Sequence, residues 1–152
     1  MVADTKYYLG GSNTSFGGAE TYYNWERGTT VYSGRSTSWI GKIGLMYPSD
    51  YSYTYALGVD NTCYNDGSYG GCGKSSGKTN GWIYNTNSNS FQWLLSPRSA
   101  GSYGAFFLFD SGSVDGDGVN SSLGVRPSLY LVSSIKIDSG EGTEQSPYHL
   151  SM

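Results

Sequence analysis

Two aspartates and an asparagine in the segment SVDGDGVNSSLGVRP, residues 113–127, have the spacing closest to a metal site in this chain. A calcium loop of the EF-hand type needs oxygen ligands at alternate positions, glycine at position six and a bidentate acid at position twelve. Counted from Asp115, position three is Asp117, position six is Asn120 and position twelve is Arg126. Two required positions therefore carry the wrong residue, and we expect neither a metal nor a cofactor.

The sequence also contains no convincing set of catalytic residues. Glu20 and Glu26 would have to act as a glycosidase pair, but nothing places them beside a cleft. A Ser-His-Asp triad would depend on His149, the single histidine, which lies close to the end of the chain. The glycine-rich stretch GGSNTSFGG lacks the Lys-Ser/Thr ending of a phosphate loop. We therefore expect a protein that is not an enzyme.

Cys63 and Cys72 enclose YNDGSYGG, a run of turn-forming residues. Such a pair is typical of a disulfide formed in an oxidising compartment, and two free thiols are the alternative. A zinc site would lack its fourth ligand. The disulfide favours an extracellular or cell-surface location. The first residues, MVADTKYYLGG, contain no apolar stretch of a signal peptide, so that location requires a targeting segment ahead of this sequence, and a cytosolic protein is the alternative.

Composition indicates one folded, strand-rich domain spanning residues 1–152. Charged residues make up 14% of the chain against a typical value of about 25%, while tyrosine occurs 15 times. This aromatic content is unlike that of a disordered chain. A net charge of -3 with scattered Lys and Arg argues against a nucleic-acid partner. No apolar run approaches the roughly 20 residues that span a membrane.

Short strands separated by polar turns dominate the expected elements, with one or two short helices. Pro48 ends a strand, and Ser49 or Asp50 is expected to cap a helix over residues 51–57. The stretch TYYNWERGTTVY is compatible with a strand pair or with a helix turn that runs into a strand. Late strands are expected at residues 103–110, 113–118 and 123–132, followed by one last strand and a polar end. The expected core residues are Trp39, Ile43, Leu45, Trp82, Trp93, Leu94 and Leu129.

Alternation along the late strands predicts a displayed face. If Phe106, Leu108 and Val114 point inward, the alternate residues point outward. The outward residues are Tyr103, Phe107, Phe109, Ser113, Asp115 and Asp117. Rigid aromatic rings mixed with small polar side chains are typical of binding surfaces. The alternative places Phe107 and Phe109 in a second core layer. Arg126 is expected to form a buried ion pair with Asp50 or Glu26.

The same region has an unusual composition. Residues 96–135 contain no Glu, Gln, Lys, Met or Trp, whereas the other 112 residues contain 18 of them. None of these five amino acids is encoded by a codon that ends in C. Codons of that form arise when the adenines of an AAC asparagine codon are randomised.

These features, together with YYLGG, KIGLMYPSDY, WLLSPRS, GVRPSLYL and SGEGTEQSPYHL, resemble pilin-like surface proteins of gut bacteria and the variable proteins of diversity-generating retroelements. The resemblance implies a C-type-lectin-like fold of the formylglycine-generating-enzyme type, an α+β and β-rich class with short helices and twisted antiparallel strands. Residues 124–127 would be scaffold. The implied variable, ligand-binding positions are Arg98, Ser102, Tyr103, Phe107, Phe109, Asp110, Ser113, Asp115, Asp117, Asn120 and Ser121.

The resemblance implies a non-enzymatic recognition module displayed on a surface. Its ligand would be a protein or a glycan on another cell, or on a phage or host surface. The alternatives are a structural pilin-like or cell-wall subunit without a ligand of its own, and a carbohydrate-binding module. Pilus assembly would depend on a hydrophobic N-terminal segment that this sequence does not contain.

Overall fold

The computed structural model describes residues 1–14, 17–56, 91–109 and 112–152, and these form two helices and nine short strands. In chain order the elements are β1 (Thr5–Tyr8), α1 (Ala19–Arg27), β2 (Ser38–Gly41), β3 (Gly44–Leu45), α2 (Pro48–Ala56), β4 (Gln92–Pro97), β5 (Gly104–Leu108), β6 (Val114–Gly118), β7 (Pro127–Ser128), β8 (Lys136–Ser139) and β9 (His149–Ser151). The chain is thus a small, strand-rich α+β protein, as the sequence predicts. No helix in these described ranges is long and apolar enough to cross a bilayer.

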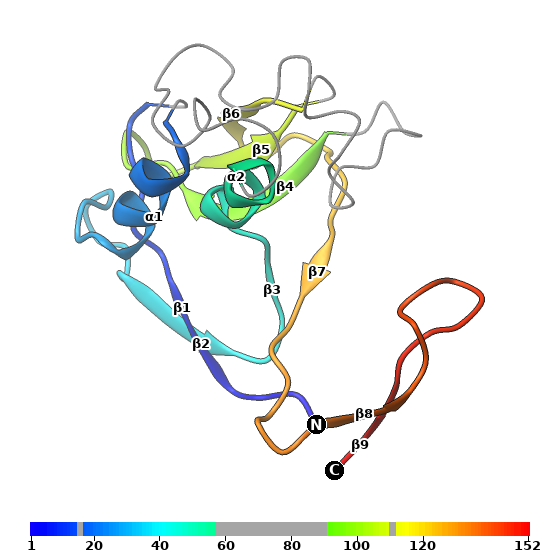
Figure 1. The fold of residues 1–152 in the computed structure, drawn as a ribbon. Coiled ribbons are helices and arrows are strands. Elements are labelled where there is room, and N and C mark those ends of the chain that lie inside the picture. The colour runs from blue at the N-terminus through cyan, green and yellow to red at the C-terminus, as the bar shows by residue number, and fades with distance from the viewer. Residues whose placement is uncertain (15–16, 57–90, 110–111) are drawn as a thin grey trace.

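Strands β4, β5 and β6 form an antiparallel sheet whose inner face packs against both helices (Figure 1). Phe106 of β5 is opposite Gly116 of β6, and Leu108 is opposite Val114. Since directly opposed residues point to the same side of a sheet, these pairs define its inner face. The core consists of inner-face and helix residues, namely Tyr22, Tyr51, Leu94, Phe106, Leu108 and Val114. The expected core position of Leu94 is confirmed.

Helix α1 includes the first part of the stretch TYYNWERGTTVY, for which the sequence allowed either a strand pair or a helix turn that runs into a strand. Its buried residues Ala19, Tyr22 and Glu26 recur at spacings of three and four, which places them on one helical face. Glu20 in the first turn and Arg27 in the last turn complement the helix dipole. Gly28 follows the helix, and its N–H donates to the Trp25 carbonyl at 3.1 Å.

Helix α2 begins three residues before its expected start. Pro48 occupies the first turn, where its missing N–H costs no hydrogen bond, and Tyr51 N–H donates to the carbonyl of Tyr47. Ser49 and Asp50 lie inside the helix, so the expectation that one of them precedes it as its cap is wrong; Asp50 Oδ2 accepts the Tyr47 N–H at 3.2 Å from within the first turn and stabilises this end. The Ser49 N–H and hydroxyl instead donate to Glu26 of α1, and this contact joins the two helices.

The lower part of the molecule in Figure 1 consists of two-stranded ladders, β1 with β2 and β3 with β7. Tyr7 is buried there, and its ring stacks on Trp39 at a centroid distance of 5.3 Å. The expectation that Trp39, Ile43 and Leu129 belong to the core is wrong, because all three are exposed. Trp39 is on β2, Ile43 lies between β2 and β3, and Leu129 follows β7, so all three are outside the helix–sheet core. Leu45 and Trp93 are partly buried, and Trp82 lies outside the described residues.

The expected buried ion pair of Arg126 is also absent from the described part of the chain. The two ion pairs there join Arg27 to Glu26 and Lys42 to Asp4. Arg126 is only partly buried, so its guanidinium does not require a carboxylate partner.

The last seventeen residues form a hairpin rather than a single strand. Strands β8 and β9 pair antiparallel, with Ile137 opposite Leu150. The hairpin projects away from the body of the molecule past the N-terminus (Figure 1).

Candidate ligand-binding surface

The sequence-predicted site residues lie on β5, on β6 and in the turns beside them, but on two faces of the sheet. Phe107 is opposite Asp115, and Ala105 is opposite Asp117, so these four residues share the outer face, away from the helices. Gly116 is opposite the core residue Phe106 and therefore lies on the inner face.

Phe107 is buried, so the expectation that it meets solvent is wrong. Only 7% of its surface is exposed. Its ring packs against Phe91, Trp93 and Phe109 at centroid distances of 5.9, 6.2 and 5.9 Å, and we call these four residues the outer aromatic cluster. The alternative of a second aromatic layer thus holds for Phe107. Phe109 remains exposed at the edge of this cluster.

The two aspartates of β6 are held by their own backbone. Asp115 Oδ1 accepts the Gly116 N–H at 2.7 Å, and Asp117 Oδ1 accepts the Gly118 N–H at 2.7 Å. Asp117 Oδ2 also accepts the Ser121 hydroxyl at 2.8 Å. The Gly118 N–H, with a smaller effect of Ser121, lowers the pKa of Asp117. Asp117 is therefore a fixed anion at the surface.

A polar cavity of about 260 Å³ opens where β4 ends and β5 begins. We call it the Arg98 pocket, and its lining consists of Arg98, Ala100, Gly101, Tyr103, Gly104, Gly116, Asp117 and Gly118. The Arg98 N–H donates to the Gly104 carbonyl at 2.8 Å, which fixes the base of the side chain.

The Arg98 side chain is positioned by main-chain carbonyls. Nη2 donates to the carbonyl of Asn13 at 3.0 Å, and Nη1 lies 3.4 Å from the carbonyl of Gly116. The guanidinium of Arg35 donates to the Arg98 carbonyl from the other side. No carboxylate in the described part of the chain forms an ion pair with Arg98. Its charge is therefore held in place but not neutralised there.

Glycines of β6 make room for the side chains of the pocket. A Cβ at Gly116 would lie 2.4 Å from Arg98 Cδ, and a Cβ at Gly118 would lie 3.3 Å from the Tyr103 ring. Arg98 and Tyr103 therefore lie on the inner side of the ladder, beyond the region that the helices cover. Tyr103 is 68% exposed, as the sequence predicts. The alternating glycines of VDGDG are the sequence signal for these overlying side chains.

The remaining predicted positions divide between the two faces. Ser102 is exposed and directly precedes Tyr103. Asn120 is exposed in the turn after β6. Ser113, just before β6, is partly buried. The single face expected to carry Tyr103, Phe107 and Asp115 is thus split. Asp110, Cys63 and Cys72 lie outside the described residues.

Two residues that form hydrogen bonds with Arg98 carry no signal in the sequence. Asn13 and Arg35 reach Arg98 from segments 85 and 63 residues away. Their part depends on tertiary structure, which no local pattern predicts.

Glu26 is the most perturbed carboxyl group of the described chain. It is 1% exposed, and burial, opposed by the two Ser49 hydrogen bonds, raises its pKa to about 7. It lines none of the described cavities, and Glu20 is exposed.

No group of three potential metal ligands of the His, Cys, Asp and Glu types gathers within the described residues. Comparison of the chain with family models, with curated proteins and with solved structures gives no match.

Proposed function

We propose that this chain is a non-enzymatic recognition module with a C-type-lectin-like fold, displayed on a cell surface. The two helices packed on a twisted antiparallel sheet support the fold proposal. The turn-rich segment between Cys63 and Cys72 supports an oxidising, extracellular location. The binding surface is the Arg98 pocket with its neighbours Ser102, Asn120 and Ser121.

The observation that carries this proposal is an arginine that forms no ion pair with any acid of the described residues and lies beside an exposed tyrosine, both over a glycine floor. Main-chain contacts hold Arg98 before any ligand arrives, so binding costs little side-chain entropy. The exposed Tyr103 ring offers a rigid contact area with a hydrogen-bonding hydroxyl.

The ligand class follows from these groups. A guanidinium with open donors favours a carboxylate, and a tyrosine ring favours stacking on a sugar or an apolar side chain. An acidic glycan or an acidic protein loop satisfies both when its acid meets Arg98 and its neutral polar groups meet the carboxylate of Asp117, which also lines the cavity. The cavity of about 260 Å³ accommodates one protruding group rather than a whole ligand.

A binding screen tests this function. Wild-type protein and the variants Arg98→Ala and Tyr103→Ala are applied to glycan and protein arrays, with and without a chelator. We expect at least one ligand whose capture falls tenfold or more in both variants and does not change with the chelator. Tyr32→Ala, which removes an exposed tyrosine outside the pocket, serves as the matched control.

Circular dichroism separates lost binding from lost folding. Ligands captured equally by wild type, Arg98→Ala and Tyr103→Ala would contradict the proposed site. Capture of no ligand from either array would count against a recognition module and favour the structural subunit.

A further inference from the structure

The hairpin β8–β9 has one apolar face and one polar face. Ile137 and Leu150 are opposite each other and point to the same side. Tyr148 comes just before β9, and its ring lies beside Gly142 of the hairpin loop, where a Cβ would be 2.6 Å from it. Lys136 and Ser151 form the neighbouring pair and point to the other side. We call Ile137, Tyr148 and Leu150 the hairpin face.

The described part of the chain leaves much of this hairpin face exposed. Ile137 is 61% exposed, Tyr148 is 53% exposed and Leu150 is 38% exposed. A two-stranded hairpin is marginally stable by itself and needs a surface on which to bury an apolar side. Three large apolar side chains gathered on a projecting arm are typical of an interaction site.

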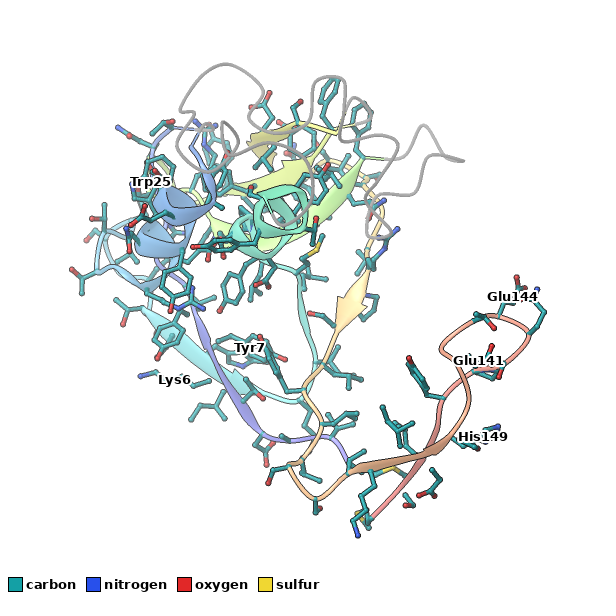
Figure 2. The ribbon with its side chains drawn as sticks, in the orientation of Figure 1. Lys6, Tyr7, Trp25, Glu141, Glu144 and His149 are labelled. Carbon is teal, nitrogen blue, oxygen red and sulfur yellow. The ribbon has the colours of Figure 1, made fainter. Side chains whose placement is uncertain are left out.

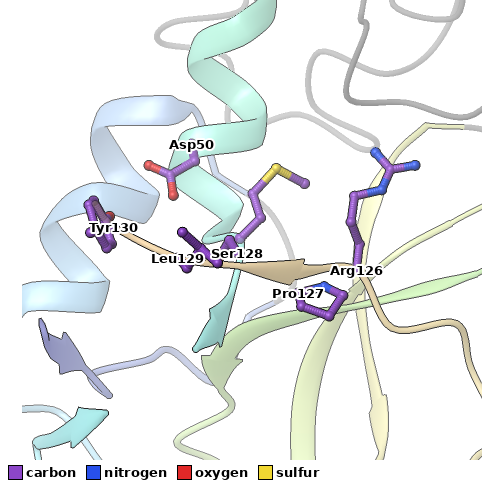
Figure 3. A pocket seen from close by; sticks show the side chains of 7 residues that line it. Asp50, Arg126, Pro127, Ser128, Leu129 and Tyr130 are labelled. Carbon is purple, nitrogen blue, oxygen red and sulfur yellow. The ribbon is translucent and has the colours of Figure 1, made fainter. Parts of the chain in front are cut away.

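The body of the molecule exposes a matching groove between α2 and β7. The cavity has a volume of about 410 Å³, and Met46, Pro127, Leu129 and Tyr130 form its apolar lining. Arg126 lies at one end and points away from Asp50 of α2 (Figure 3). Leu129 and Tyr130 are about half exposed, so the groove has apolar surface left to bury.

Charge also matches between the hairpin and the groove. The loop that joins β8 to β9 carries Glu141 and Glu144, both at the end of the hairpin far from the body (Figure 2). Neither glutamate forms an ion pair within the described ranges, and neither does Arg126 of the groove. Docking with the loop at the Arg126 end of the groove would place these acids near the arginine and away from Asp50, the other charged residue of the lining.

We propose that the hairpin face of one copy docks into the α2–β7 groove of a second copy, in a reciprocal two-fold dimer. The hairpin and the groove belong to the same chain, but the turn at residues 132–135, closed by a hydrogen bond from Ile135 N–H to the Val132 carbonyl, directs the hairpin outward. Two copies can bury both surfaces at once, and a two-fold arrangement closes without further growth.

Sedimentation velocity over a range of protein concentrations tests the dimer. We expect wild type to dimerise and Ile137→Ser with Leu150→Ser to raise the dimer dissociation constant at least tenfold. Lys136→Ser, on the polar face of the same strand, serves as the matched control and should dimerise like wild type. A wild-type monomer at all concentrations, or a dimer that Ile137→Ser and Leu150→Ser leave intact, would overturn the proposal.

Mixing of variants tests which surfaces meet. One variant keeps its groove but has Ile137→Ser and Leu150→Ser, and the other keeps its hairpin but has Arg126→Glu and Leu129→Ser. We expect each to be monomeric alone and the mixture to form a heterodimer through the one intact contact, with near-ultraviolet circular dichroism confirming that both are folded. Folded variants that do not associate in the mixture would show that the groove is not the acceptor.

Discussion

At the scale of single residues, Glu26 is the carboxyl group whose pKa is most perturbed in the described chain, and opposing effects act on its charge. Its carboxyl group is buried between the helices, where desolvation disfavours the charge, yet two donors of Ser49 favour it. Desolvation is the larger effect, and the pKa rises from 4.5 to about 7. The folded protein therefore binds a proton that the unfolded chain releases at lower pH.

This conflict predicts a pH-dependent stability. Because the folded-state pKa is raised, the stabilisation is complete below pH 4.5 and is lost as the pH rises towards 7. The shift corresponds to about 3 kcal/mol in the free energy of unfolding. Glu26→Gln stays neutral and keeps an acceptor for Ser49, so its profile should be flatter than that of wild type in urea titrations between pH 4.5 and 8. The exposed Glu20→Gln on the same helix should keep the wild-type slope, and an equally steep slope in Glu26→Gln would refute this role.

Phe107 and Tyr103 lie four residues apart and should respond oppositely to truncation. Phe107→Ala removes a ring from the outer aromatic cluster and should cost about 3–5 kcal/mol of unfolding free energy. Tyr103→Ala removes an exposed ring and should change stability by no more than about 0.5 kcal/mol. Chemical denaturation measures both values. A large loss in Tyr103→Ala would show that its ring supports the fold.

At the scale of elements, the β5–β6 ladder explains how the Arg98 pocket is built. Opposed residues set which side chains share a face, and glycines at 116 and 118 leave the space that Arg98 and Tyr103 occupy. The floor of the pocket is therefore built from two paired strands, which favours a fixed geometry, whereas Arg98 and Tyr103 come from the turn that joins β4 to β5.

Gly116→Ala tests this construction. The new Cβ would clash with the Arg98 stem, so the guanidinium should leave the Asn13 carbonyl and stability should fall by about 1–3 kcal/mol. The penalty should shrink when Arg98→Ala is added, because the clash is then gone. Gly101→Ala, whose Cβ would meet the Tyr103 ring at an ordinary 3.7 Å, provides the comparison. Equal costs of Gly116→Ala with and without Arg98 would rule out the clash.

Sequence patterns predicted strands better than they predicted burial. Alternation located β5 and β6 closely because that signal is local, and the helix expected at residues 51–57 forms but begins at Pro48. Alternation says which residues share a face, but it does not say whether that face is covered. Phe107 was therefore assigned correctly to the face of Asp115 and wrongly to solvent.

At the scale of the whole molecule, apolar surface is distributed unevenly. The core lies between the helices and the inner face of the sheet, whereas Trp39, Ile43 and Leu129 lie outside it and remain exposed. Hydrophobicity alone therefore overestimated the core. Of the positions proposed from the sequence, Arg98 and Tyr103 lie together in the Arg98 pocket as half-exposed or exposed residues of a turn, and the supporting residues Asn13 and Arg35 come from distant segments.

The central claim is that the residues around the Arg98 pocket can change without unfolding the protein and thereby change its ligand. The most direct measurement is selection of a surface-displayed library varied at Ser102, Tyr103 and Asn120 against several unrelated glycan and protein ligands. A matched library varies Thr29, Tyr32 and Ser33, which are exposed outside the pocket. We predict folded binders with distinct ligands from the first library and none from the second. Unfolded pocket variants, or equal enrichment of the two libraries, would contradict the account.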